Sequence, residues 1–192
     1  MKILNKNKVD FGGRLDDVYI NESWPMWKQF YAANYPVLRD MCAILLVCFI
    51  LFGMIFNIHV VSGTSMEPTF ESGNIIIGNH IAPDLERGNV MICKPSNYGE
   101  IIIKRIIGVP GDVIDIDYEN GIVYRNGVAL DEPYVKAPTW VDLGVEFPIT
   151  VEKDCYFVMG DNRNNSLDSR YPQIGLIHRN EVISTYLFTV WG

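Results

Sequence analysis

The sequence predicts a mostly β protein, in which an antiparallel, barrel-like β domain follows one N-terminal transmembrane helix. Two observations carry this prediction. A long uncharged apolar run lies near the N-terminus, and short apolar segments separated by turn residues, including two Asn-Gly pairs, fill the rest of the chain. Several short strands without a convincing soluble helix are typical of barrel-like β domains. The 192 residues give room for one such domain with appendages.

The apolar run is long enough to cross a bilayer. Residues 41–61 are 21 positions without Lys, Arg, Asp or Glu, and a helix of that length spans roughly 31 Å, close to the hydrocarbon thickness. A cleaved signal peptide has a short basic leader and a shorter apolar core, whereas a long stretch of mixed charge precedes this run. A buried core helix of this length normally shows a polar face. We therefore expect an uncleaved transmembrane helix over residues 37–61.

Basic residues predict the orientation of this helix. Six Lys or Arg residues precede the run, none occurs in the twenty positions after it, and the next is Arg87. The positive-inside rule leaves residues 1–36 in the cytoplasm and residues 62–192 on the extracytoplasmic face. We expect a single-pass protein of the cytoplasmic membrane, in contact with the lipid bilayer.

The N-terminal segment ends in an aromatic stretch, residues 24–35. Its aromatic residues recur at spacings of three and four, and Pro25 suits a first helical turn. This pattern indicates a short amphipathic helix in the headgroup layer. A docking surface for a cytoplasmic partner is the alternative.

Composition limits the partners of the β domain. Residues 62–192 hold 10 basic and 18 acidic side chains, which disfavours nucleic acid because its binding needs a basic face. Cys93 and Cys155 fall where a disulfide is permitted, but the sequence does not show that they meet. No metal-like spacing exists, so we expect no metal or cofactor. The sequence gives no indication of the oligomeric state.

Apolar segments after the helix predict the strands. The alternation of Val113–Tyr118, followed by Asn120-Gly121 and then Asn126-Gly127, predicts two consecutive hairpins. Residues 131–150 are rich in Pro and charge and indicate loops or an inserted segment. The strands are expected at residues 75–77, 90–92, 101–107, 113–118, 122–124, 155–159 and 182–191.

Ser65 follows the apolar run closely. Gly63 permits a close backbone approach, and Pro68 disfavours a helix at the residue before it, so Ser65 is expected in a loop or at a strand end. No His, Asp or Glu stands immediately beside it. A serine in such a turn is usually only a turn residue, so its chemistry depends on a base from elsewhere.

Lys104 is the unusual ionisable group of the chain, because it stands among the isoleucines of residues 101–107. On a strand, Lys104 and Arg105 point to opposite faces, so one of them can face inward. Burial favours the neutral amine and can lower the pKa of a lysine from about 10.4 to about 7–8. An amine with such a pKa can deprotonate a serine at neutral pH. A surface lysine with its stem on apolar neighbours is the alternative. None of the three histidines, His80, His178 and His59 at the membrane edge, has a setting that suggests a catalytic base.

Three stretches together resemble the characteristic boxes of bacterial type I signal (leader) peptidases. They are SGTSMEPTF at 62–70, KRIIGVPGD at 104–112 and GDNRNNSLDSR at 160–170, with RGNVMIC at 87–93 as a weaker fourth. Their order and spacing also match, as does one N-terminal helix, so the resemblance covers residues 37–192.

The resemblance implies a Ser-Lys dyad with Ser65 as nucleophile and Lys104 as general base. Ser166 would hydrogen-bond the lysine amine and orient it. The oxyanion would rest on backbone N–H groups, chiefly that of Ser65, because Gly63 stands where some members have a hydroxyl residue. The second donor stays unassigned.

The resemblance also implies supporting residues. Two structural ion pairs would form between Arg105 and Asp161 and between Asp168 and Arg170. The residues expected to line shallow pockets for small side chains just before the cut are Val61, Met66, Phe70 and Ile103. An extended small-x-small substrate would dock as an added strand between residues 61–64 and 101–103.

The sequence thus predicts a membrane-anchored serine endopeptidase that removes signal peptides from exported preproteins. One alternative is a specialised relative that matures a narrow set of substrates, such as pilins or conjugation proteins. Another is a catalytically silent, anchored β domain that only binds extended peptides.

Overall fold

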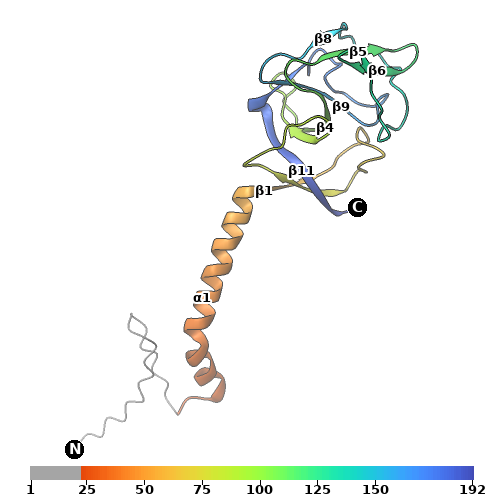
Figure 1. Ribbon diagram of the computed structural model, residues 1–192. Coiled ribbons are helices and arrows are strands. Elements are labelled where there is room, and N and C mark those ends of the chain that lie inside the picture. Colours follow the sequence, from red (N-terminus) through yellow and green to blue (C-terminus); the bar gives the residue numbers. More distant parts are fainter. Residues whose placement is uncertain (1–22) are drawn as a thin grey trace, which may run out of the picture. The chain divides into compact units, whose positions relative to one another are not determined.

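The structure is a computed structural model that describes residues 23–192. The described chain divides into two compact units, one that ends at Gly53 and one that comprises Met54–Gly192, and Figure 1 colours both along the sequence. What the sequence predicts for residues 1–22 lies outside the described residues.

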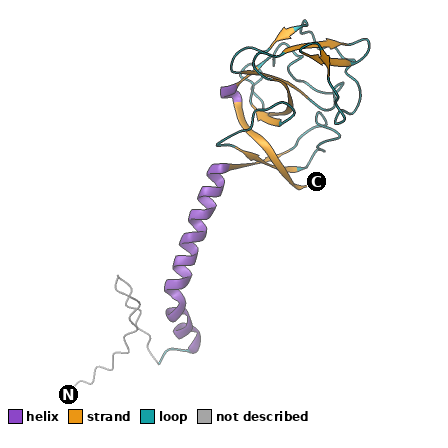
Figure 2. Ribbon diagram, viewed as in Figure 1, coloured by secondary structure: helices purple, strands orange, loops and turns teal. Residues whose placement is uncertain are grey.

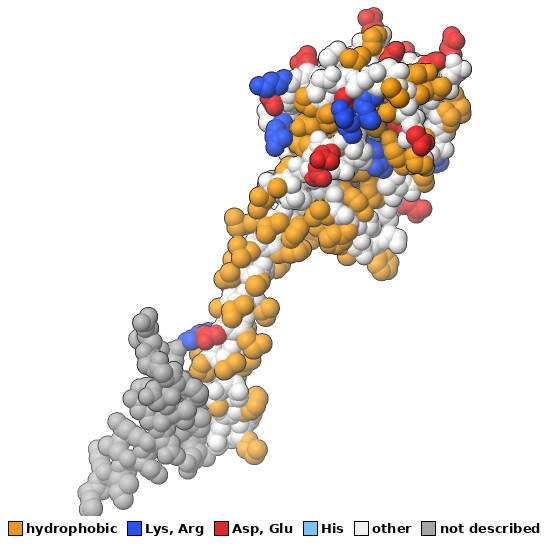
Figure 3. All heavy atoms as spheres, viewed as in Figure 1, with side chains coloured by type: hydrophobic (Ala, Val, Ile, Leu, Met, Phe, Trp, Pro, Cys, Tyr) orange, Lys and Arg blue, Asp and Glu red, His pale blue; other side chains and the backbone are white. Residues whose placement is uncertain are grey.

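Helix α1 comprises Met26–Ile55. Within residues 23–192 it is the one helix that is long and apolar enough to cross a membrane. None of its side chains is buried, and apolar side chains cover most of its length (Figure 3). Its charged residues near the middle are neighbours, and Arg39 Nη2 lies 3.0 Å from Asp40 Oδ1.

The helix bounds differ from the expected 37–61 at both ends. Residues 56–60 form strand β1, because their backbone pairs with β2 from Phe56–Asn79 to Val60–Ile75. At the other end, the aromatic stretch is not a separate interfacial helix. It continues into the apolar run through Pro36, which lies inside α1.

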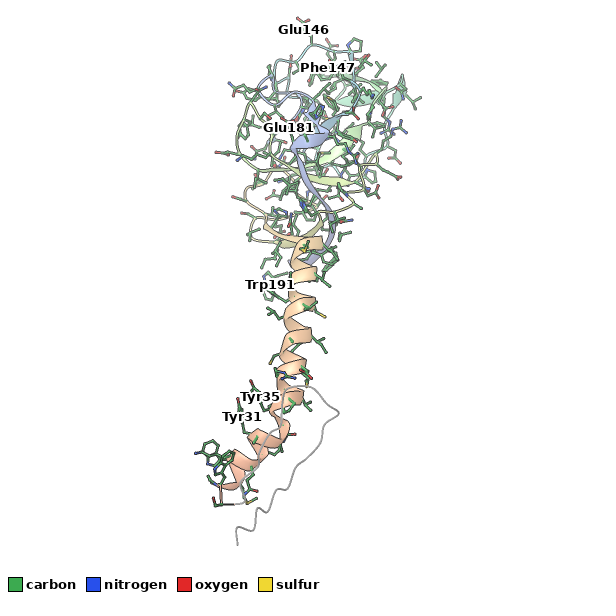
Figure 4. The ribbon with its side chains drawn as sticks, turned by 90° about the vertical axis from the view of Figure 1, so that its left-hand side faces the viewer. Tyr31, Tyr35, Glu146, Phe147, Glu181 and Trp191 are labelled. Atoms are coloured by element: carbon green, nitrogen blue, oxygen red, sulfur yellow. The ribbon has the colours of Figure 1, made fainter. Side chains whose placement is uncertain are left out.

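The aromatic stretch instead forms the first turns of α1. The Pro25 carbonyl accepts a hydrogen bond from the Lys28 N–H at 2.8 Å, as expected for a proline at a helix start. Tyr31 and Tyr35 lie one turn apart on the same side, with ring centroids separated by 5.9 Å (Figure 4).

The β domain contains two antiparallel sheets (Figure 2), which confirms the predicted fold class. In spatial order, the seven-stranded sheet consists of β1 (Phe56–Val60), β2 (Ile75–Asn79), β11 (Val182–Trp191), β3 (Val90–Cys93), β4 (Ile102–Gly108), β9 (Cys155–Met159) and β10 (Ile177–His178). The four-stranded sheet consists of β7 (Val128–Ala129), β6 (Ile122–Arg125), β5 (Val113–Asp117) and β8 (Ile149–Thr150). A short 3-10 helix, Arg179–Glu181, precedes β11.

The seven strands that the sequence predicts are all present, and four more were missed. Strands β7, β8 and β10 have two residues each, too few to leave a pattern. Strand β1 was hidden in the apolar run.

Both predicted hairpins form. Asn126 and Gly127, with φ of 54° and 77°, make the two-residue loop between β6 and β7. The β5–β6 connection is longer, and the Asp117 carboxylate accepts hydrogen bonds from the Glu119 and Asn120 N–H groups there.

One cluster of buried apolar side chains lies under the loop that carries Ser65. It joins Val61, Met66 and Phe70 of that loop to Ile76 of β2 and to Val90 and Ile92 of β3. The loop is therefore fixed to the sheet by its own apolar residues.

The disulfide that the sequence left open does not form. All four cysteines of the chain lie in the described part, and all are free. Cys93 on β3 and Cys155 on β9 are both buried, but β4 lies between their strands in the sheet.

Candidate active site

Ser65 lies in the loop that follows β1, at residues 61–74. The loop leaves and rejoins the sheet at one place, where the Val61 N–H donates to the Asn74 carbonyl and the Gly73 N–H donates to the Val61 carbonyl, each at 2.9 Å. A turn inside the loop is closed by the Phe70 N–H and the Met66 carbonyl. These bonds fix both ends of the segment that presents Ser65.

Lys104 lies on β4, between β3 and β9 in the seven-stranded sheet, and pairs with Met91 of β3. Its Nζ atom is 2.8 Å from Ser65 Oγ and 2.9 Å from the carbonyl oxygen of Ile103. The structure thus brings together the serine and the lysine that sequence reasoning selected.

The environment of Lys104 favours the neutral amine. The side chain is only 4% exposed, and desolvation by this burial lowers its pKa from the ordinary 10.5, although the Asp168 carboxylate opposes the shift. A neutral amine has a lone pair and can accept the proton of a nearby hydroxyl.

The expected hydrogen bond between Ser166 and the Lys104 amine is not formed. The Ser166 hydroxyl instead donates to Asp168 Oδ2 at 2.8 Å. A carboxylate is the stronger acceptor, and this bond closes within one short loop.

Asp168 is fully buried and holds several donors at once. Its two oxygens accept hydrogen bonds from the Arg170 guanidinium at 2.8 and 2.9 Å, and Oδ2 also accepts the Gly160 N–H. Burial alone raises the pKa of Asp168, but the hydrogen bonds and charge of Arg170 outweigh it and hold the pKa below its usual value. The carboxylate therefore stays ionised.

Arg105 and Asp161 form the other expected ion pair. Arg105 Nε donates to Asp161 Oδ1 at 2.8 Å, and Nη2 contacts Oδ2. Thr69, from the loop of residues 61–74 that carries Ser65 (the serine loop), donates to the same carboxylate. Arg105 Cζ lies 4.1 Å from the centroid of the Tyr134 ring. This pair therefore ties β4, the 160–170 loop and the serine loop together.

Two asparagines that the sequence did not single out hold the backbone beside Ser65. Asn162 Nδ2 donates to the Thr64 carbonyl at 3.0 Å, and the Asn162 N–H donates to the Ser65 carbonyl at 3.0 Å. Asn165 Nδ2 donates to the Thr64 hydroxyl at 2.9 Å. Their crowding in GDNRNNS was the available signal, but composition alone indicates only a loop.

Gly160 was also missed, although the approach of two segments depends on it. A Cβ atom at Gly160 would collide with the Ser65 carbonyl oxygen and with the Ser166 side chain. The absence of a side chain lets the serine loop and the 160–170 loop touch.

The backbone around Ser65 leaves one candidate oxyanion donor. Among residues 23–192, the Ser65 N–H has no hydrogen-bond acceptor. Gly63 has φ of 87°, in the region that favours glycine, and its N–H donates to the Ser72 hydroxyl at 3.3 Å. The Gly63 N–H is thus already hydrogen-bonded, whereas the Ser65 N–H is not.

A cleft of about 560 Å³ opens over the dyad. Val61, Met66 and Ile103 line it, as expected. Phe70 does not line it: this ring is buried below and packs on Tyr186 of β11, with centroids 4.9 Å apart. In the described part of the chain, no group of three His, Cys, Asp or Glu side chains is placed to hold a metal ion.

An apolar helix ahead of an antiparallel β domain, whose loop holds a serine hydroxyl against a buried lysine amine, defines the class of membrane-anchored serine peptidases. The comparison with protein families agrees with this class. The family described as "Signal peptidase, peptidase S26" matches residues 36–191, and the chain belongs to this family.

Individual relatives are similar over most of the β domain. The chain is 36% identical over 150 residues to Signal peptidase I of Bacillus caldolyticus, covering 71% of this chain and 80% of the relative. It is 34% identical over 149 residues to Signal peptidase I P of Bacillus subtilis subsp. natto, covering 72% and 79%. A crystal structure of a signal peptidase I from Enterococcus faecalis V583 aligns with a TM-score of 0.44 and 28% identity, over 54% of this chain and 96% of that one.

Replacing Lys104 by methionine tests the burial of the amine. Folding lowers the pKa of Lys104. Between that lowered pKa and the ordinary 10.5, the unfolded chain binds more protons than the folded chain, so the stability of the wild type rises with pH. We expect Lys104→Met to melt at a higher temperature than wild type at pH 7, by about 2–4 °C for each 1 kcal/mol gained, and the difference to shrink as pH approaches 10.5. Thermal unfolding of the full chain in detergent measures it. A difference that does not change with pH would contradict the neutral, buried amine.

Replacing Gly160 by alanine tests the contact between the two loops. The added methyl group must displace Ser65 or Ser166, and we expect about a hundredfold lower kcat because small displacements of reacting groups have such effects. Gly53→Ala is the matched control, since a Cβ there has no atom within 4 Å. Equal kcat values for the two variants would show that the approach at Gly160 is not needed.

Proposed function

We propose that this chain removes signal peptides from exported preproteins by a Ser-Lys mechanism, with Ser65 as nucleophile and Lys104 as general base. The observation that carries the proposal is the 2.8 Å distance between the Ser65 hydroxyl oxygen and a lysine amine that is almost completely buried. A lysine in contact with a serine on the surface would stay protonated and could not serve as a base.

The reaction proceeds in two halves. The Ser65 hydroxyl transfers its proton to Lys104 Nζ while its oxygen attacks the carbonyl carbon of the residue before the cut. The Ser65 N–H donates to the developing oxyanion. Lys104 then protonates the leaving amine, and the same neutral amine takes a proton from the water that hydrolyses the acyl-enzyme.

Open strand edges support the proposed substrate position. Strand β4 pairs with β3 from Ile102 to Arg105, but its pairing with β9 begins only at Arg105. Residues 102–104 therefore have an open edge toward the cleft. Strand β1 pairs on one side only, with β2. An extended segment lying between these edges forms backbone hydrogen bonds and brings its small side chains to Val61, Met66 and Ile103.

The neighbouring charged groups support a positioning role. The ionised Asp168 carboxylate is paired with Arg170, and Asp161 is paired with Arg105, and these pairs hold the loops in place. Ser166 acts through Asp168, whose ionised carboxylate lies near enough to the Lys104 amine to affect its pKa.

We further propose that residues after the helix lie outside the cytoplasmic membrane, since Lys and Arg gather before α1 and none occurs in the twenty positions that follow residue 61. In this orientation the site faces preproteins that emerge from the membrane with their own signal helices still inserted. Confinement of both reactants to one surface shortens the search and helps to orient the bond.

Removal of either dyad member tests the reaction. Purified full chain in detergent or vesicles should cleave a preprotein with a small-x-small site, whereas Ser65→Ala and Lys104→Ala should each lose about 10³-fold or more in kcat, because the nucleophile or its base is missing. Mass spectrometry of the products locates the cut. Turnover at the wild-type rate by either variant would contradict the dyad, and no cleavage by wild type would favour a peptide-binding domain.

Protease protection tests the orientation. A protease added outside intact spheroplasts should digest the β domain and leave an N-terminal tag on residue 1 protected, as detected by blotting. Membranes opened by detergent serve as the control, because tag and domain are then both accessible. Protection of the β domain in intact cells would reverse the proposed topology.

A further inference from the structure

The cleft over the dyad contains polar side chains as well as an apolar wall. Val61, Met66 and Ile103 form apolar lining, but His59, Tyr98 and Glu100 line the same cleft. Pockets for small side chains just before the cut give no role to these polar groups. A role for His59 in recognising substrate residues further from the cut rests on the proposed function and extends it.

His59 is placed by strand geometry on the same face as Val61. Along β1 the exposed residues Ile58 and Val60 alternate with the half-buried His59, and Val61 beyond it is buried. Side chains two residues apart on a strand point the same way and lie about 7 Å apart. His59 is therefore two residues further from Ser65 along the chain than Val61, which forms the pocket wall.

A contact with β11 holds the imidazole in place. His59 Nε2 lies 3.2 Å from the hydroxyl oxygen of Ser184 on β11, and Ser184 is fully buried. Strand β2 lies between β1 and β11, and its residue next to Ser184 is Gly78, where a Cβ atom would collide with the Ser184 side chain. The glycine thus leaves room for a histidine and a serine to meet across an intervening strand.

One ring nitrogen remains available. Within residues 23–192, His59 Nδ1 has no hydrogen-bond partner. Desolvation lowers the pKa of His59 below its usual value, so at neutral pH the ring is uncharged and each nitrogen is either a donor or an acceptor. A fixed, neutral imidazole suits a neutral polar side chain better than an aliphatic one.

We infer that His59 forms a subsite for the fifth residue before the cut, and that this subsite selects a neutral hydrogen-bonding side chain such as glutamine over an aliphatic one. In an extended substrate, every second side chain faces the same wall. If the third residue before the cut meets Val61, the fifth meets His59. Glu100 lines the same cleft, so an acidic residue at this position is disfavoured by its like charge.

Short soluble peptides test the subsite, because they remove differences in membrane insertion. Two peptides share a small-x-small site and differ only in Gln or Leu at the fifth position before the cut. For the full-length wild type, we expect kcat/KM to favour the Gln peptide by about threefold to tenfold, as for one net hydrogen bond. His59→Leu should bring this ratio to one or below, whereas His59→Gln, which keeps a hydrogen-bonding group, should restore a preference for Gln.

His80→Leu is the matched control. His80 is also a histidine beside β2, and its Nδ1 atom lies 2.8 Å from the Ile183 carbonyl oxygen, but it does not line the cleft. This variant should keep the wild-type ratio. The inference is overturned if wild type does not distinguish the two peptides, or if His59→Leu and His80→Leu show the same ratio.

Failure of this inference can be told from failure of the proposed function. Wild-type cleavage that disappears in Ser65→Ala supports the proposed reaction whatever the ratio at the fifth position. If neither peptide nor preprotein is cleaved, the proposed function itself fails. Because each ratio compares two substrates on one enzyme preparation, partial misfolding of His59→Leu cancels from it.

Discussion

The contact between the Lys104 amine and the Ser65 hydroxyl depends on keeping water away from an amine. An amine in water takes up a proton, and burial is what opposes this. Lys104 is buried on an interior strand of the larger sheet, where β3 flanks its strand and the serine loop contributes the hydroxyl. Much of the remaining structure can be understood as holding that loop over the lysine.

Two loops far apart in the sequence meet to do this. Residues 61–74 and 160–170 are joined through Asn162 and Asn165, and Gly160 permits their close approach. The second loop is itself held in place by Arg163. The buried guanidinium of Arg163 pairs with Glu132 at 2.7 Å, and the backbone carbonyl of Arg163 accepts a hydrogen bond from Arg170. Buried ion pairs add little net stability compared with apolar packing, but they demand one geometry. A site that needs fixed distances benefits from that demand.

The charged groups near Lys104 favour its protonated form less than burial disfavours it. Asp168 would attract a proton to the amine if its charge were free. It is instead satisfied by Arg170, Ser166 and the Gly160 N–H. Desolvation therefore remains the dominant influence, and the pKa of Lys104 falls. The buried ion pairs and the neutral amine are thus parts of one electrostatic arrangement.

Sequence alone determined the features that depend on local pattern. Strand alternation, Asn-Gly turns, the apolar run and the choice of Lys104 as a lysine among isoleucines all follow from neighbouring residues. Tertiary structure decided the rest, because each remaining feature depends on a partner from a distant segment. Pairing with β2 turned residues 56–60 into a strand and ended the helix at Ile55. The Ser166 hydroxyl donates to Asp168 and not, as the resemblance implied, to the Lys104 amine. The Phe70 ring packs on Tyr186 and does not line the cleft. His59 could be connected with Ser184 only once β2 had brought β1 and β11 together, because no local pattern encodes a contact between residues more than a hundred positions apart.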